Sequence, residues 1–551
     1  MSKNLRGLSA REGLDNSLYE EIVGASHKGY EKSDGNLKRV AGDFLVGHST
    51  VLGVSSFYEF LRTEHAGKKV FICDGTACLT SGKQEKLRTE LQKHFKPGEI
   101  GTVTCLGHCH TNNAFMYNNH TWSTDDLGNL GLLLKSEEGM APDFNTGTNS
   151  GTPAMMDPVA DMEDYYDTIL SFATEHQKAI EEITLSGLRG RGGAGFPFHI
   201  KVKSAREAAG SKKYVVCNAD EGDPGAFSDK WLLEERPHAV LAGMMLAGFL
   251  IGADEGVLYI RGEYPESVAA AKEAVAQLVK AGILGENIRG TGLSFRFHVI
   301  EGSGAYICGE ETSLLNSLEG LRPEVRTRPP FPAVYGLFGK PTVLSNVETF
   351  ANLRFILKEG GKAWAAMGTE KSAGTKLVSL DGAFRKPGIY EVRMGTPLRY
   401  VLDTLGGGTR YPVKAFQIGG PLGGLVPATK VDDLTLDFES FAAAGFLLGH
   451  AGVVSIPEDF PIAELLSHLF EFTARESCGK CFPCRIGSHR GHELLERAIR
   501  HGEKIDRELF DDLLETLQIG SLCALGGGLP LPVQNALKYF GDELAPHFTT
   551  N

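Results

Sequence analysis

A run of closely spaced glycines that leads into a hydrophobic strand constrains this chain more than any other segment. Residues 187–201 read G-L-R-G-R-G-G-A-G-F-P-F-H-I-K, and residues 213–230 read K-Y-V-V-C-N-A-D-E-G-D-P-G-A-F-S-D-K. Glycine lets the backbone approach a bulky anionic ligand, and backbone N–H groups beside a helix N-terminus can bind phosphate. The segment therefore predicts a phosphate cradle. The alternative is a flexible surface turn, which glycine clusters also form.

The same glycines match the dinucleotide pattern G-x-G-x-x-G through Gly190, Gly192 and Gly195. That fingerprint requires a strand before the glycines and a helix after them. Here residues 161–186 carry acidic and apolar residues at helical spacing, and the hydrophobic strand at 213–218 comes only after the glycines. The loop is therefore not predicted to be an ordinary first βα turn.

The composition favours a globular protein with several domains. The chain has 551 residues, of which 42% are hydrophobic and 23% charged, and its formal net charge of −13 disfavours a nucleic-acid partner. Its first residues lack the apolar core of a signal peptide, and its longest apolar run, 239–253, is too short to span a bilayer. We expect a cytoplasmic protein without direct membrane insertion, which a partner could still hold at a membrane.

Eight of the ten cysteines fall into two groups of four, a distribution that points to metal or cluster ligation rather than disulfides. The groups are Cys73, Cys78, Cys105 and Cys109, and then Cys478, Cys481, Cys484 and Cys523. Each pair of the first group follows a predicted strand, which would place four thiolates at one end of one sheet. The Cys-x2-Cys-x2-Cys spacing of the second group is typical of a [4Fe–4S] cluster. Structural zinc is the alternative for both groups, and a domain without metal is a further one for the first.

The remaining candidates near these ligands are expected to have no metal role. Cys217 and Cys308 lie beside the glycine motifs and are predicted to be buried packing thiols. His108 and His110 flank Cys109, but four cysteines are already present, so we expect neither histidine to be a ligand.

Three long motifs carry a family resemblance: G-R-G-G-A-G-F-P at 190–197, N-A-D-E-G-D-P-G-A-F at 218–227 and G-A-Y-I-C-G-E-E-T at 304–312. They resemble the NADH-binding flavoprotein subunit of respiratory complex I, which recurs in NAD-linked hydrogenases and in NAD-linked, metal-dependent formate dehydrogenases. The likeness covers about 161–551, and the N-terminal part resembles the thioredoxin-like [2Fe–2S] ferredoxin domain that accompanies this subunit.

The resemblance implies a multidomain α/β architecture. Its expected parts are a thioredoxin-like [2Fe–2S] domain with N-terminal helices at 1–140, a linker at 141–160, a Rossmann-like FMN- and NAD(H)-binding domain at 161–368, a ubiquitin-like β-grasp domain of SLBB type at 369–457, and a helical [4Fe–4S] bundle at 458–551. The cofactors it implies are FMN, NAD(H), one [2Fe–2S] cluster and one [4Fe–4S] cluster.

The resemblance also implies residue roles. The positions expected to surround FMN are Gly190, Arg191, Gly192, Lys201, Asn218, Asp220, Tyr306, Ser345, Asn346 and Thr349. Three further glycines of the two loops are expected to bind a cofactor: Gly193, Gly195 and Gly309. The carboxylates expected at the NAD(H) ribose, where they would repel the 2′-phosphate of NADP, are Glu221, Asp223, Glu310 and Glu311. Phe196 and Phe331 match aromatics that sandwich the adenine. Three positions depart from the family: Ser345 replaces Asn, Arg328 replaces Lys, and Ser204 replaces a third aromatic.

These features predict hydride transfer between NAD(H) and FMN, followed by single-electron exchange with the clusters. Two glycine loops, each expected between a strand and a helix, would hold the two ligands together, and no side chain need act as acid or base. The chain is expected to be one subunit of a larger redox complex, with iron–sulfur and catalytic subunits as partners.

Fusion of the [2Fe–2S] unit to the flavoprotein resembles NAD-linked formate dehydrogenases and NAD-reducing hydrogenases more than complex I, and we expect a molybdenum or tungsten formate dehydrogenase as the parent complex. The diaphorase subunit of an NAD-reducing nickel–iron hydrogenase follows closely, and a complex I subunit and an electron-bifurcating assembly stay open. A non-enzymatic NADH sensor with structural zinc is the alternative from a different class.

Overall fold

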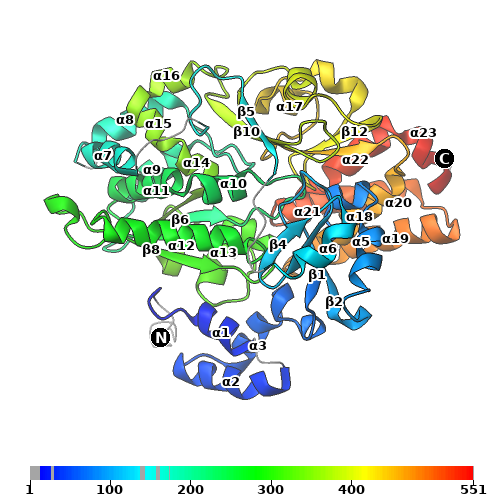
Figure 1. Cartoon of the computed structure of the whole chain (residues 1–551), viewed down its shortest axis with the longest axis horizontal. Coiled ribbons are helices and arrows are strands. Elements are labelled where there is room, and N and C mark those ends of the chain that lie inside the picture. Colours follow the sequence, from blue (N-terminus) through cyan, green and yellow to red (C-terminus); the bar gives the residue numbers. More distant parts are fainter. Residues whose placement is uncertain (1–12, 27–29, 137–142, 157–161, 173, 550–551) are drawn as a thin grey trace.

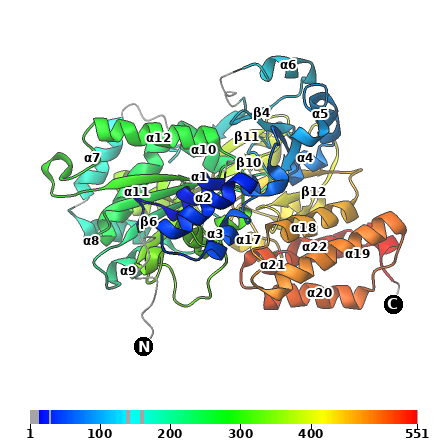
Figure 2. The ribbon, with the colours of Figure 1, turned by 90° about the horizontal axis from the view of Figure 1, so that it is seen from below.

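The computed structural model describes residues 13–26, 30–136, 143–156, 162–172 and 174–549. The described residues form three β-sheets of four, six and four strands, followed by a C-terminal group of helices. Figure 1 shows these helices, coloured orange to red, gathered at one end of the molecule, and Figure 2 shows them stacked side by side. No helix among the described residues has the length and apolar character needed to cross a membrane.

The first sheet has the order β2-β1-β3-β4 and forms the expected cysteine-bearing unit. Its strands are β1 (Val70–Cys73), β2 (Ile100–Val103), β3 (Ala114–Tyr117) and β4 (His120–Ser123). The strands β1 and β2 are parallel, so the cysteine loops that follow them leave the same edge of the sheet. Between β1 and β2 lie the short helix α4 (Thr76–Thr80) and α5 (Gln84–Leu91).

The flavin sheet, with the order β8-β7-β6-β9, is wholly parallel. Its strands are β6 (Tyr214–Ala219), β7 (Glu255–Ile260), β8 (Arg296–Glu301) and β9 (Thr342–Asn346). The strands β6 and β7 are almost continuously apolar because helices cover both faces of the sheet. On one face lies α11 (Pro237–Ile251), whose residues 239–251 are all buried.

Two consecutive helices follow the acidic loop. The first is α10 (Ser228–Glu235), and α11 begins at Pro237 after Arg236 has left the helical conformation. A proline lacks the N–H of a helix interior and restricts the residue before it, which accounts for the break.

The other face of the flavin sheet is covered by N-terminal helices that we expected to extend the cysteine-bearing unit. These are α1 (Leu18–Ser26), α2 (Tyr30–Asp43) and α3 (His48–Ser55). Their apolar side chains form one core with strand residues such as Val216 and Val257. The N-terminal segment therefore helps to build the nucleotide-binding domain as well.

We had expected the first glycine loop to lie between a strand and a helix, but it does not. It connects α8 (His176–Ser186) to α9 (Phe198–Glu207), and the Gly190 N–H closes it by donating to the Phe196 carbonyl at 2.8 Å. Because β6 comes after α9 in the chain, no strand of this sheet leads into the loop. The loop lies instead beside the end of β9. The absence of the ordinary Rossmann turn is thus confirmed.

The third sheet contains a strand from the predicted linker. Its order is β13-β12-β14-β10-β11-β5, and its strands are β10 (Thr375–Leu380), β11 (Gly388–Arg393), β12 (Val413–Ile418), β13 (Gly424–Pro427), β14 (Gly452–Pro457) and the edge strand β5 (Asn145–Thr148). After β5, the Glu391 carboxylate accepts the N–H groups of residues 154–156 at 2.7–3.0 Å. The side chains of β5 are exposed or half-buried, so composition alone could not distinguish this strand from a linker.

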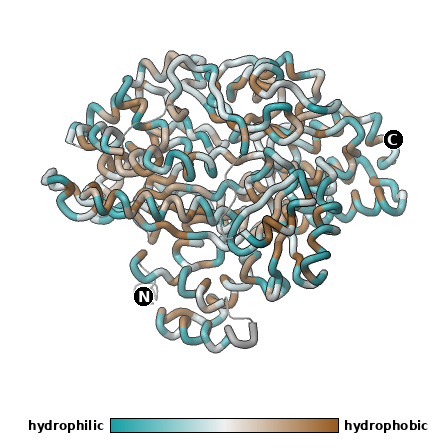
Figure 3. Tube along the Cα trace, in the orientation of Figure 1, coloured by the Kyte–Doolittle hydropathy of each residue, from teal (hydrophilic) through white to brown (hydrophobic). Residues whose placement is uncertain are grey.

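The C-terminal helices are α18 (Ile462–Glu476), α19 (Ser488–His501), α20 (Arg507–Gly520), α21 (Ala524–Gly528), α22 (Pro530–Tyr539) and α23 (Gly541–Leu544). The sequence prediction of a helical region is confirmed. Three cysteines lie between α18 and α19, and the fourth, Cys523, immediately precedes α21. Figure 3 shows hydrophilic residues along the outer parts of these helices, which leaves their apolar positions for the inner contacts.

A buried ion pair joins the flavin domain to the β-grasp sheet. Lys376 on β10 pairs with Glu348 on α14 (Val347–Ala351), and each side chain is only 1% exposed. The other Glu348 oxygen accepts the Leu377 N–H at 3.0 Å. The carboxylate is therefore fully used, and its charge depends on Lys376 for compensation.

We predict that Lys376→Met lowers the free energy of unfolding by about 3–5 kcal/mol, because it leaves a buried carboxylate without its counter-charge. The urea midpoint of the purified chain measures this loss. The control is Lys430→Met, whose partner Asp433 is 59% exposed and whose loss should cost under about 1 kcal/mol. Equal midpoints for the two variants would contradict the prediction.

Candidate functional site

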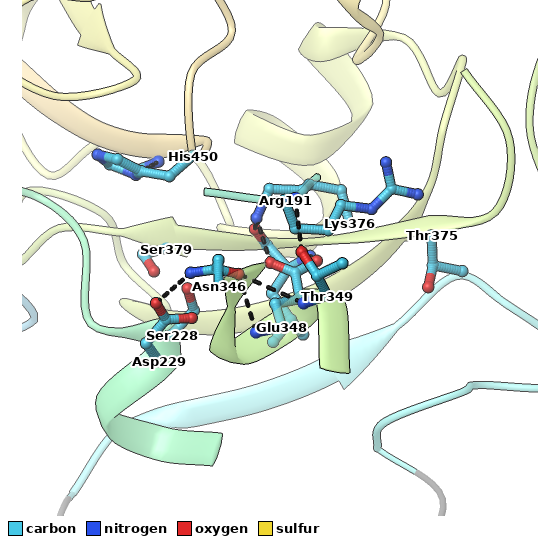
Figure 4. A network of polar contacts seen from close by, with 12 residues as sticks. Arg191, Ser228, Asp229, Asn346, Glu348, Thr349, Thr375, Lys376, Ser379 and His450 are labelled. Carbon is cyan, nitrogen blue, oxygen red and sulfur yellow. Dashed lines mark hydrogen bonds and ion pairs between the residues drawn. The ribbon is translucent and has the colours of Figure 1, made fainter. Parts of the chain in front are cut away.

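Arg191, in the first glycine loop, is buried at the end of β9 with part of its guanidinium unused. Its backbone N–H donates to Thr349 Oγ1 at 2.9 Å (Figure 4). Its Nη2 donates to the Ala373 carbonyl at 2.6 Å. Nε and Nη1 have no hydrogen-bond partner among the described residues, although the side chain is 1% exposed. Burial lowers the pKa of Arg191 to about 10. Unpaired N–H groups on a buried cation fit an anionic ligand.

The wall beside Arg191 is shaped for close approach of the backbone. Asn346 caps α14 by accepting the N–H groups of Glu348 and Thr349 at 2.9 and 3.3 Å, and it donates to Asp229 at 2.5 Å (Figure 4). A Cβ on Gly192 would lie 2.9 Å from the Asn346 Cβ, so only glycine fits there. The cradle and the unpaired guanidinium together fit the phosphate of FMN.

The end of β6 contacts the second glycine loop and leads into the acidic loop. Asn218 donates to the Gly309 carbonyl at 2.7 Å, which ties the end of β6 to the second loop. Asp220 Oδ2 is buried without a hydrogen-bond partner among the described residues, and burial raises the pKa of this carboxyl well above its usual value. Both residues are among the positions that the sequence predicts to surround FMN.

Glu221 is used differently from the ribose contact that we expected. Its two carboxylate oxygens accept the Asp229 and Lys230 N–H groups at 2.9 and 3.0 Å, and one also accepts the Ser228 hydroxyl at 3.2 Å. The side chain is 6% exposed. Glu221 therefore caps α10, because a helix start needs acceptors for its free N–H groups. The sequence pattern contains no signal that separates such a cap from a ligand contact.

Asp223, also expected at the ribose, is held between two domains. Tyr306 donates to its Oδ1 at 2.6 Å, and His450 of the β-grasp region lies 3.2 Å from its Oδ2. Burial acts against ionisation, but His450 and Tyr306 hold the pKa of Asp223 below its usual value. The Asp223 carboxylate is thus already engaged by protein groups. The sequence did not predict the role of His450, because this histidine is far from the acidic loop in the chain and belongs to no motif.

The second glycine loop follows β8 and leads through a short 3-10 turn into α13 (Glu311–Leu318), as predicted. Glu310 caps α13 with Oε2, while its Oε1 is buried without a hydrogen-bond partner among the described residues. Glu311 accepts from Lys201 at 3.3 Å and from Arg328 at 2.8 Å. The structure thus brings Glu310, Glu311, Lys201 and Arg328 together at one place.

Two aromatic side chains that the sequence assigns to the adenine are exposed and free to stack on a base. Phe196 is 46% exposed and Phe331 is 56% exposed, whereas most phenylalanines of the chain are buried. Exposed aromatic faces fit a planar base such as adenine. Ser345, by contrast, is a buried residue of β9 at 6% exposure.

The N-terminal cysteines form a compact buried group. All four are buried, and the Cys105 and Cys109 sulfurs lie 3.8 Å apart. The Cys105 pKa is lowered by its contact with Cys109 and, against burial, by the nearby charge of Arg261. Two cysteine pairs on neighbouring loops fit a [2Fe–2S] cluster, in which two cysteines bind each iron. His108 uses both ring nitrogens on Thr121 and Ser123, as expected for a residue that is not a ligand.

The C-terminal cysteines come from two segments that pack closely. A Cβ on Gly526 would lie 2.6 Å from the Cys484 Cβ, so α21 reaches the Cys478–Cys484 segment only because glycine is present. Burial raises the pKa of Cys484 to about 11 and that of Cys523 to about 12. In the described chain, no three His, Cys, Asp or Glu side chains converge on a single ion. A [4Fe–4S] cluster needs no such point, because each cysteine binds its own iron.

The fold and the site define a class: an FMN- and iron–sulfur-containing flavoprotein that uses a nicotinamide nucleotide. Four family models match the chain. They are the thioredoxin-like [2Fe–2S] ferredoxin at 26–129, the Nuo51 FMN-binding domain at 183–354, the SLBB domain at 377–426, and the NADH-ubiquinone oxidoreductase-F iron–sulfur binding region at 464–547.

Proteins similar to this chain belong to the same class. The chain is 43% identical to the NADP-reducing hydrogenase subunit HndC of Solidesulfovibrio fructosivorans, over 67% of this chain and 76% of that protein. It is 40% identical to an NADH-quinone oxidoreductase subunit of Escherichia coli, over 66% and 83%. A crystal structure of NAD+-reducing [NiFe]-hydrogenase matches with a TM-score of 0.86 at 27% identity, over 100% of this chain and 95% of that one. The chain therefore belongs to the NADH-binding flavoprotein subunits of complex I and NAD-linked hydrogenases, which confirms the resemblance.

We predict that Arg191→Met lowers the FMN content of the purified chain at least tenfold, because it removes the unpaired N–H donors of a buried cation. Flavin absorbance per iron atom measures the loss. The control is Arg191→Lys, which keeps the charge but not the guanidinium geometry and should retain more FMN than the methionine variant. Full FMN in Arg191→Met would contradict the assignment.

We also predict that Cys523→Ser removes the [4Fe–4S] signal and leaves the [2Fe–2S] signal intact, because the two ligand groups are separate. Iron analysis and electron paramagnetic resonance (EPR) spectra measure both. Cys308→Ser, at a buried cysteine outside both groups, should keep both signals. Loss of the [4Fe–4S] signal in Cys308→Ser alone would show that we have assigned the wrong cysteine.

Proposed function

We propose that this chain is the diaphorase subunit of an NAD(H)-linked, metal-dependent oxidoreductase of hydrogenase type. The observation that carries this proposal is the fusion: the cysteine-bearing sheet, the flavin sheet, the β-grasp sheet and the helical region are one chain. The solved NAD+-reducing [NiFe]-hydrogenase chain has the same extent, since it matches over 100% of this chain. The quinone oxidoreductase relative from Escherichia coli matches over 66% of it.

Formate dehydrogenase, our first expectation from the sequence, becomes the second candidate. The relatives named above belong to hydrogenases and quinone oxidoreductases, and the fusion, which resembles both kinds of parent complex, does not favour formate dehydrogenase over hydrogenase. Either parent supplies a partner with its own metal centre. In both cases we place the chain in the cytoplasm, with any membrane attachment provided by partner subunits.

The chain's own residues would bind and orient the two nucleotides. The Gly190–Gly195 loop, Arg191, Asn218, Asn346 and Thr349 would hold FMN at the ends of β6 and β9. FMN, when bound, accepts a hydride from NADH and exchanges electrons singly with the clusters. Phe196 and Phe331 would stack on the adenine, which fixes the nicotinamide end relative to the flavin. Positioning is sufficient, and no side chain is assigned the role of acid or base.

Nucleotide choice would depend on Glu310 and Glu311. A carboxylate hydrogen-bonds ribose hydroxyls but repels a 2′-phosphate. Glu311 also engages Lys201 and Arg328, so these cations are not free to bind phosphate. We therefore propose a preference for NAD(H) over NADP(H).

We predict that Glu311→Gln raises the ratio of kcat/KM for NADPH to that for NADH by roughly tenfold or more. The substitution removes a negative charge and releases Lys201 and Arg328. Reduction of ferricyanide by each nucleotide measures the ratio. Glu324→Gln, an exposed carboxylate paired with Arg322, is the control and should leave the ratio unchanged. An unchanged ratio in Glu311→Gln would exclude this residue from specificity.

Metal analysis of the native complex, isolated anaerobically through this chain, tests the parent complex. Nickel would support the hydrogenase assignment, and molybdenum or tungsten would replace it with formate dehydrogenase. Neither metal, with membrane subunits present, would point to complex I. Bleaching of the isolated protein by NADH separates all of these from a nucleotide sensor with structural zinc, which would bind NADH without oxidising it.

A further inference from the structure

Two loops of the flavin domain contact the cysteine loops of the N-terminal unit directly. One is the acidic loop, in which the Gly225 N–H donates to Cys109 Sγ at 3.2 Å and the Asp223 carbonyl lies 3.8 Å from Cys105 Sγ. The other is the turn after β7, which begins with Arg261. Neither contact uses a side chain that we assign to FMN or NAD(H), so their role needs a separate explanation.

Arg261 is a buried cation that faces the cysteine loop. It is 3% exposed, and its Nη2 donates to the carbonyl of Thr104, the residue before Cys105, at 3.0 Å. Its Nη1 donates to the Glu221 carbonyl at 2.7 Å. Glu263, 5% exposed, is its ionic partner at 2.8 Å. The guanidinium therefore bridges the cysteine loop and the acidic loop, with its negative partner on the flavin-domain side.

The Gly225 contact is equally fixed by packing. Gly225 has a φ of +98°, which favours glycine, and a Cβ there would lie 2.6 Å from Val454 Cγ2 of the β-grasp sheet. On the other side, Pro224 lies 3.4 Å from the position of a Cβ on Gly75. The N–H that points at Cys109 is thus held by elements of three domains.

We propose that Arg261 is a positioning residue that raises the reduction potential of the N-terminal cluster, with the Gly225 N–H acting in the same direction. The inference rests on the proposed ligation of the [2Fe–2S] cluster by Cys105 and Cys109. One-electron reduction adds a negative charge to a buried group. A nearby buried cation and an N–H donor to a ligand sulfur stabilise the reduced form more than the oxidised form.

The proposal makes Glu263 the opposing group. Its carboxylate neutralises part of the Arg261 charge, so its removal should favour the reduced cluster. A purely structural role for the ion pair predicts something else: loss of either partner would disturb the same loops and shift the potential in the same direction, or not at all. Opposite shifts from the two partners therefore distinguish an electrostatic effect from a structural one.

The experiment is an anaerobic redox titration of the purified full-length protein, followed by the [2Fe–2S] signal in EPR. Arg261→Gln should lower the ratio of reduced to oxidised [2Fe–2S] at a fixed poise by roughly tenfold, and Glu263→Gln should raise it. Arg261→Lys, which keeps the charge, should stay within about twofold of the parent protein. The ratio of reduced to oxidised [4Fe–4S] cluster in the same sample should not change.

A matched control is Arg326→Gln, at a partly buried cation that pairs with Glu319 and contacts neither cysteine loop. It should leave the [2Fe–2S] ratio unchanged. If Arg261→Gln does not fold, the upward shift in Glu263→Gln alone supports the proposal, and a downward or absent shift overturns it. Equal shifts in Arg261→Lys and Arg261→Gln would also overturn it.

Failure of the ligation itself has a separate signature. Cys109→Ser should abolish or strongly change the [2Fe–2S] spectrum while FMN content stays near that of the parent protein. An unaltered spectrum in Cys109→Ser would show that this cysteine is not a ligand, and the role of Arg261 would be overturned with it. An altered spectrum in Cys109→Ser, together with unchanged potentials in both Arg261→Gln and Glu263→Gln, would overturn the potential effect alone.

Discussion

Four parallel strands that end at one edge of one sheet are the constraint on which the rest of this structure depends. In a parallel sheet the carboxyl ends lie together, and ligands bind in the crevice outside them. Here the acidic loop follows β6, Arg261 follows β7, and the second glycine loop follows β8. Asn346 is the last residue of β9. The first glycine loop reaches the same edge from outside the sheet, through the contact of Arg191 with Thr349.

The other domains close over this edge. The β-grasp region contributes Lys376 and His450, and the helical region contributes Glu476, which accepts the Tyr306 N–H at 2.8 Å. The N-terminal unit contributes the cysteine loop beside Gly225. A water-excluding environment strengthens each of these electrostatic contacts. The fold thus serves electron transfer by making one crowded interior out of four domains.

The sequence was most informative where chemistry requires particular residues at particular spacings. Cysteine spacing predicted the two cluster groups, the glycine motifs predicted the two loops, and the family resemblance implied the Rossmann-like domain. It was least informative where a residue acts through its partner in space. Glu221 as a helix cap and His450 beside Asp223 depend on contacts between segments far apart in the chain. The edge strand β5 depends on backbone pairing with β11, which leaves no pattern in exposed side chains.

The path of the N-terminal segment has a consequence for assembly. The cysteine-bearing sheet is preceded by α1–α3, which are part of the core of the flavin sheet, and followed by β5, which pairs with the β-grasp sheet. The unit is thus tethered at both ends, so its effective concentration at the acidic loop is set by chain geometry and does not change with dilution. Where such a unit is a separate polypeptide, occupancy of this place depends on affinity. In this chain every flavin site carries its own [2Fe–2S] unit from the moment of folding.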